Sequence, residues 1–135
     1  MPKICIRREI VNRLIALARE NQREESCGLL AGSSGVITRA FPATNAAAHP
    51  ATAYEIAPEE LFRLMREIRA NKLELLGVYH SHPAGENAPS ARDIERAYYP
   101  DAAYFILSPL LDAQKPIRAF SLRDGRVSEL DIQIV

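Results

Sequence analysis

Two of the three histidines in the chain, His80 and His82, stand two positions apart, and Ser90 and Asp93 follow them. The run ELLGVYH, which ends at His80, is largely apolar and predicts a buried strand. Residues two apart on a strand point to the same face, so both imidazoles can meet at one ion. Asp93 can add a carboxylate, and two nitrogens with one oxygen leave a zinc ion a fourth position for water. The spacing therefore fits a catalytic zinc site.

Each part of this pattern also has an ordinary structural explanation. A His-x-His triplet is common at a polar strand end, and Ser90-x-x-Asp93 fits a capping box at the start of a helix. Capping does not account for the two histidines upstream, so the combination favours a metal site. Whether Ser90 caps, takes part in chemistry or does both stays open, because a hydroxyl has one donor and two acceptor lone pairs.

The bulk composition is that of an ordinary globular protein. The chain has 135 residues, of which 47% are hydrophobic and 25% charged, and we interpret residues 1–135 as one domain. Seventeen basic side chains balance seventeen acidic ones, so no strong field points to nucleic acid or to an anionic membrane. No stretch approaches the roughly 20 apolar residues that span a bilayer, and no signal-peptide segment is evident.

The two cysteines, Cys5 and Cys27, are too few for a disulfide framework and do not form a close metal-binding pair. We interpret them as thiols in a reducing compartment, which together with the missing signal segment predicts a cytoplasmic protein. Cys27 is expected to be a small buried side chain rather than a nucleophile.

Hydrophobic periodicity predicts helices at about 7–22, 57–72 and 90–99. Strands are predicted at 26–32, 36–41, 74–80 and 102–108, with a short strand at 54–56 and a C-terminal hairpin about Asp124-Gly125. This mixture predicts an α/β (α+β layered) domain with a mixed β-sheet flanked by helices.

The segment HSH (80–82), the seven residues 83–89 and the segment SARD (90–93) together resemble the JAMM motif of the MPN+ (JAB) zinc metalloproteases. Upstream, ESCGLLAG (25–32) is similar to the E-x-C-G-L-L-x-G stretch of compact prokaryotic members. The resemblance runs from about Ile4 to the last predicted strands. It implies a JAB/MPN fold, which resembles the cytidine-deaminase-like architecture.

The resemblance also implies a role for each matched residue. His80, His82 and Asp93 would bind Zn²⁺. Glu25 would act as general base and then as proton donor to the leaving amine, a division of labour that suits a carboxylate beside a metal. Ser90 would help to stabilise the oxyanion, an effect commonly worth about 3 kcal/mol. Without the match, Glu25 would be interpreted as a solvated residue in a charged turn.

Family members cleave after the C-terminal Gly-Gly of ubiquitin-like proteins. The short chain resembles the compact form associated with ubiquitin-like sulfur-carrier proteins, from which an amino acid or short extension is removed. The implied partner is such a carrier, and the enzyme would be a monomer or homodimer that binds neither nucleic acid nor membrane.

Three other functions can be compared with this pattern. An isopeptidase that removes a ubiquitin-like modifier from lysine would use the same site, so it stays open. A non-catalytic MPN interaction module usually lacks the metal ligands that this chain retains. A nucleobase deaminase needs His-x-Glu and Pro-Cys-x-x-Cys, and the chain has no Cys-x-x-Cys, so this class is excluded.

Overall fold

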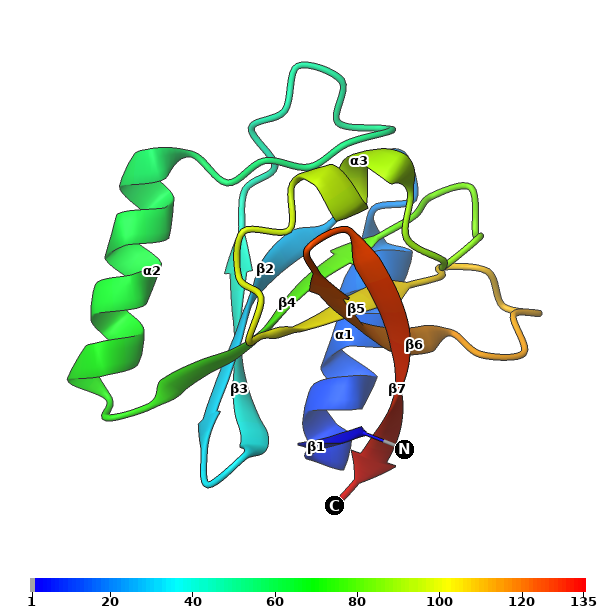
Figure 1. Cartoon of the computed structure of the whole chain (residues 1–135). Coiled ribbons are helices and arrows are strands. Elements are labelled where there is room, and N and C mark those ends of the chain that lie inside the picture. Colours follow the sequence, from blue (N-terminus) through cyan, green and yellow to red (C-terminus); the bar gives the residue numbers. More distant parts are fainter. Residues whose placement is uncertain (1) are drawn as a thin grey trace.

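A computed structural model of the protein describes residues 2–135 (Figure 1). Its seven strands are β1 (Lys3–Ile6), β2 (Cys27–Ser33), β3 (Val36–Ala43), β4 (Glu74–Ser81), β5 (Ala103–Leu107), β6 (Ile117–Arg123) and β7 (Arg126–Ile134). Its helices are α1 (Arg8–Glu20), α2 (Pro58–Ala70) and the short α3 (Ala91–Glu95). The predicted mixed sheet with flanking helices is confirmed.

The strands lie in the order β1-β3-β2-β4-β5-β6-β7, and β1 also pairs with β7, which closes the sheet into a barrel. Three neighbouring pairs are parallel (β1 with β3, β1 with β7, β4 with β5), and the other four are antiparallel. The sequence predicted a layered sheet but neither its closure nor strand β1. No helix within residues 2–135 has the length and apolar character needed to cross a bilayer.

The two long helices cover opposite faces of the strands (Figure 1). Successive residues of β2 alternate between the two cores, as the period of two in a strand requires. Leu30 packs in the core beneath α1 with Leu14, whereas Leu29 packs in the core beneath α2 with Leu64 and Ile68. Both helices are amphipathic, with buried residues spaced at three and four positions.

The glycine at the centre of ESCGLLAG allows close packing of the strands around the site. A Cβ on Gly28 would lie 2.5 Å from the Tyr79 ring and 2.5 Å from the Phe41 carbonyl oxygen, closer than any real Cβ contact. Tyr79 is fully buried and stands opposite Gly28 in the antiparallel β2–β4 ladder. The same ladder pairs Cys27 with His80, so the end of β4 lies beside the start of β2.

Two sequence expectations differ from the structure, and one is confirmed. Residues 54–56 form no strand, because the amide of Glu55 donates to the Asn45 side chain and its carbonyl accepts from the amide of Ala46, so this segment is held as a loop. The helix expected at 90–99 ends at Glu95. The hairpin at Asp124-Gly125 is confirmed, with φ of 53° and 75° at the two turn residues.

Candidate metal centre

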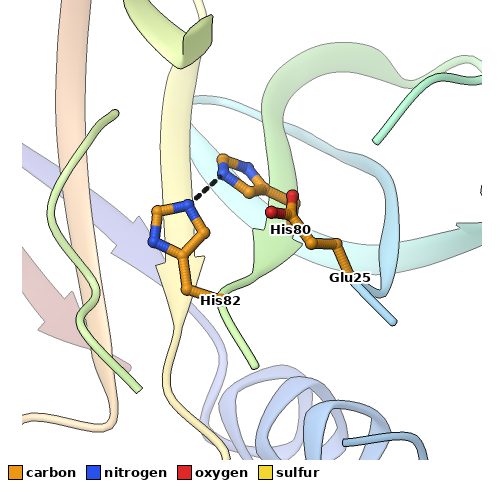
Figure 2. A group of neighbouring side chains, drawn as sticks. All are labelled: Glu25, His80 and His82. Atoms are coloured by element: carbon orange, nitrogen blue, oxygen red, sulfur yellow. Dashed lines mark hydrogen bonds between the residues drawn. The ribbon is translucent and has the colours of Figure 1, made fainter. Parts of the chain in front are cut away.

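His80 and His82 lie at the C-terminal end of β4. His80 is the penultimate residue of that strand, is fully buried, and pairs with Ile106 of β5. His82 follows the strand, and its amide donates to the Leu107 carbonyl over 2.9 Å, which extends the parallel pairing by one bond. Both imidazoles therefore lie next to each other where the parallel strands β4 and β5 end, as the spacing predicted (Figure 2).

Asp93 completes a triangle of ligand-type atoms. Its Oδ2 lies 3.2 Å from His80 Nε2 and 3.0 Å from His82 Nε2, and the two nitrogens lie 3.1 Å apart. Zinc bonds of about 2.0–2.1 Å in a tetrahedron separate the ligand atoms by roughly 3.3 Å. The triangle is close to one face of that tetrahedron.

The tautomer of His82 makes this triangle unfavourable without a cation. His82 Nδ1 donates to the Glu86 carbonyl over 2.6 Å, so in the neutral ring Nε2 carries the lone pair and faces the Asp93 carboxylate. Two acceptors at 3.0 Å repel unless a proton or a metal ion lies between them. A carbonyl that fixes the outer nitrogen of a ligating histidine is also usual at zinc sites. The donor set therefore fits zinc.

The electrostatics of the triangle favour deprotonated ligands. Burial alone would raise the pKa of Asp93, but its contacts with His80 and His82 hold that pKa well below its usual range. Burial lowers the pKa of His80. Burial would also lower the pKa of His82, but Asp93 and the Glu86 carbonyl raise it, so a proton competes for its Nε2. Metal ligands must be deprotonated to bind, and two of the three already are.

Glu25 lies beside the two histidines, with one carboxylate oxygen within 4.8 Å of their ligand nitrogens (Figure 2). The residue is only 5% exposed, and its Oε1 has no hydrogen-bond partner within residues 2–135. Burial raises the pKa of Glu25 to about 7, against the lowering effect of His82. A buried, unpartnered carboxyl group with a pKa near neutrality can accept and return a proton.

The segment that carries Glu25 is fixed from both sides. Ser81, between the two histidines, accepts from the amide of Ser26 over 2.8 Å and donates its own amide to the Ser26 carbonyl. The Asn45 amide group donates to the carbonyls of Glu25, Pro50 and Ala53, over distances of 2.9–3.3 Å. Sequence reasoning missed Ser81, although its place within the triplet was a signal.

Ser90 is the N-cap of α3, and it forms a capping box with Asp93. The Asp93 amide donates to Ser90 Oγ over 3.1 Å, and the Ser90 amide donates to Asp93 Oδ2 over 2.9 Å. The capping explanation is thus confirmed, and the Ser90 hydroxyl proton is not used by it. The same Asp93 oxygen accepts from the Ser90 amide and faces both histidines, so the capping box also fixes the position of this proposed metal ligand.

Tyr54 and Cys27 are the other notable neighbours. The Tyr54 ring stacks on His80 with centroids 4.5 Å apart and an angle of 23° between the planes. Sequence reasoning missed this contact, because it placed Tyr54 on a strand. Cys27 is buried, and burial raises the pKa of its thiol to about 12, so it is a poor nucleophile, as expected.

Two hollows border the candidate metal centre. One, of about 380 Å³, is lined by Glu25, Thr52, His82 and Ser90 and by the small side chains Ala51, Ala84 and Ala88. The other, of about 280 Å³, is lined mostly by apolar and aromatic residues, among them Tyr54, and by the charged residues Glu55, Arg92, Asp93 and Arg96.

Residues 7–123 match the family described as prokaryotic homologs of the JAB domain. The chain belongs to this prokaryotic JAB family. It is 34% identical to the CysO-cysteine peptidase of Mycobacterium tuberculosis over 134 residues, which cover 98% of this chain and 91% of that protein. It is 45% identical to the desampylase of Haloferax volcanii over 87 residues, 63% of each protein.

Solved structures agree with this family membership. A protein of Desulfitobacterium hafniense, solved in solution, is 31% identical and superposes with a TM-score of 0.84, covering 98% of this chain and 92% of that one. A structure described as a JAMM metalloprotease-like zinc site in the proteasome and signalosome has a TM-score of 0.62 at 18% identity, covering 97% of this chain and 98% of the other, and supports the fold alone.

Proposed function

We propose that this JAB-family chain is a zinc-dependent peptidase that cleaves the amide bond after the C-terminal Gly-Gly of a ubiquitin-like sulfur-carrier protein. It releases an amino acid or short extension. The observation that carries the proposal is the triangle of His80 Nε2, His82 Nε2 and Asp93 Oδ2, with separations of 3.0–3.2 Å, in a chain similar over 98% of its length to a CysO-cysteine peptidase.

In the proposed site, His80, His82 and Asp93 hold zinc. The ion, when bound, polarises the scissile carbonyl and makes hydroxide available at neutral pH. Glu25 takes a proton from the attacking water, and the new C–O bond forms as the carbonyl becomes tetrahedral. The Ser90 hydroxyl donates to the oxyanion, because its proton is free of the cap. Glu25 then returns the proton to the leaving nitrogen as the C–N bond breaks.

The reaction is a hydrolysis that consumes one water molecule. The hydroxyl of water ends on the carrier's terminal glycine as a carboxylate, and its proton ends on the released amine. The small side chains Ala51, Ala84 and Ala88 that line the larger hollow suit a diglycine tail, since glycine needs little room. The carrier's Gly-Gly ending, a single domain over residues 1–135 and a cytoplasmic location stay predictions, as does the likeness to the cytidine-deaminase architecture.

A second function, isopeptide cleavage, is favoured by other relatives. The chain is 36% identical over 103 residues to a probable TtuB-protein conjugate cleaving protease of Thermus thermophilus, and 45% identical to a desampylase. In that case the leaving amine is the side chain of a lysine in another protein, with the same residues in the same roles. A non-catalytic module is disfavoured, because it would not need the buried, unpartnered carboxyl group of Glu25 beside the three ligand-type residues.

The test uses zinc-loaded protein and a panel of ubiquitin-fold carriers with C-terminal extensions, read by intact mass. We expect a product that ends at Gly-Gly with wild type and none with Glu25→Gln at the same zinc content. Cleavage only of lysine conjugates would favour the isopeptidase. Equal cleavage by zinc-loaded Glu25→Gln would overturn the role of Glu25.

A further inference from the structure

Arg92 is the positively charged residue nearest in sequence to the ligand atoms, standing between the cap Ser90 and Asp93. Its side chain is exposed, and no carboxylate within residues 2–135 forms an ion pair with it. The other arginine of this segment, Arg96, differs in this respect, because Glu55 lies 3.8 Å from its guanidinium. Arg92 therefore offers a cation that the fold itself does not use.

The surroundings of Arg92 suit one small anionic group. Arg92 lines the hollow of about 280 Å³ that Asp93 also lines, and it lines an adjoining cavity of about 180 Å³. The smaller cavity is also lined by His49, Glu55 and Arg96 and by three alanines that contribute little bulk, Ala47, Ala48 and Ala53. The carboxylate of Glu55 faces the guanidinium of Arg96, so among the described residues that line this cavity the charge of Arg92 is the one left without a counterion. The volume of the cavity equals roughly six water molecules at about 30 Å³ each, which is enough for a small amino-acid residue.

We propose that Arg92 binds the α-carboxylate of the amino acid released from the carrier, so that this site selects a free C-terminal residue over a lysine conjugate. The inference rests on the proposed peptidase function and names its substrate class. In a terminal amino acid the carboxylate carbon is two bonds from the scissile nitrogen. In a lysine conjugate the scissile nitrogen is the side-chain nitrogen of the lysine. The backbone carbonyl carbon of that lysine lies several methylenes farther from it and belongs to an amide, so it carries no charge. A guanidinium fork matches a carboxylate through two parallel hydrogen bonds.

The experiment compares two carriers that differ in one group. Both end in Gly-Gly-Ala, one with a free α-carboxylate and one with an α-carboxamide, and kcat/KM is measured for each with zinc-loaded protein. We expect wild type to prefer the carboxylate by about 10- to 100-fold, the range for hydrogen bonds to a charged group. Arg92→Gln should lose that preference, because KM rises far more for the carboxylate substrate than for the carboxamide substrate.

Two further variants distinguish specific binding of the carboxylate by Arg92 from a general effect of positive charge. Arg92→Lys keeps the charge without the fork and should retain part of the preference. Arg66→Gln removes an exposed arginine from α2, away from the centre, and should keep the full preference. Circular dichroism and zinc content check that each variant is folded.

Equal rates of wild type on the two carriers would overturn the Arg92 site while leaving the peptidase in place, and so would a preference that survives in Arg92→Gln. Cleavage of lysine conjugates alone would overturn it in favour of the isopeptidase. If no substrate is cleaved, the proposed function fails and the Arg92 site fails with it.

Discussion

Ser81 and Ser26 are joined by two hydrogen bonds that connect the histidine strand to the segment of Glu25. The Ser26 amide donates to Ser81 Oγ over 2.8 Å, and the Ser81 amide donates to the Ser26 carbonyl over 2.9 Å. Ser81 is fully buried, so these bonds are shielded from water. The serine between the two histidines thus sets the distance between the proposed base and the proposed ligands.

Replacing Ser81 with Ala should lower turnover more than it lowers zinc binding. The change leaves the amide of the half-buried Ser26 without its partner, which costs about 1 kcal/mol of stability. It also frees Glu25 to shift, and we expect kcat to fall about tenfold or more. Thermal unfolding, zinc stoichiometry and kcat are measured together, with Ser128→Ala on the exposed part of β7 as the control. Wild-type kcat in Ser81→Ala would show that this connection does not position Glu25.

Two substitutions at Ser90 can separate its cap from its proposed contact with the oxyanion. Ala removes both, and the loss of the cap costs about 1 kcal/mol, whereas Gly at an N-cap costs only a few tenths. We therefore expect Ser90→Gly to be nearly as stable as wild type, and both variants to lose about 100-fold in kcat. If instead kcat fell only in the less stable Ser90→Ala and stayed near the wild-type value in Ser90→Gly, Ser90 would act only as a helix cap.

His82→Ala should lower zinc stoichiometry, because it removes one corner of the triangle with His80 and Asp93. His49→Ala is the matched control, since His49 is the third histidine of the chain and lies in the loop after β3. Metal analysis after dialysis against a weak chelator gives the readout. One zinc per chain retained in His82→Ala would remove this residue from the ligand set.

The raised pKa of Glu25 makes a prediction for the stability of the metal-free protein. Folding raises this pKa from 4.5 to about 7, so the folded state holds a proton that the unfolded state has lost. The resulting stability is fully present below pH 4.5 and is lost as pH rises to about 7. His80, His82 and Asp93 also titrate, so the comparison is with Glu25→Gln, which keeps them. Relative to that variant, wild type should lose about 2–3 kcal/mol between these pH values in denaturant titrations. If the difference in unfolding free energy between wild type and Glu25→Gln stayed constant from pH 4.5 to 7, the raised pKa of Glu25 would be contradicted.

The spacing of the site residues could be read from the sequence, but what holds them in place could not. His80, His82 and Asp93 met as expected, because the period of a strand and a capping box are local features. Ser81 was missed, since its partner Ser26 is 55 residues away and is brought near only by the β2–β4 ladder. Tyr54 was placed on a strand because its neighbours suit one.

The closure of the sheet was unpredictable for the same reason. It depends on Lys3–Ile6 pairing with residues 131–134 at the far end of the chain, and a four-residue strand of mixed polarity carries little signal. The helices were easier, because their apolar stripes repeat over 13 residues each. Local periodicity thus predicted elements and ligands, and long-range pairing decided how they meet.

The most direct test is a zinc titration of metal-free wild type, following cleavage of an extended ubiquitin-fold carrier and bound zinc in the same samples. We predict that turnover is absent without zinc, rises in proportion to bound zinc and stops rising at one ion per chain. His82→Ala should reach neither plateau. Cleavage at the full rate by the metal-free protein would contradict the account.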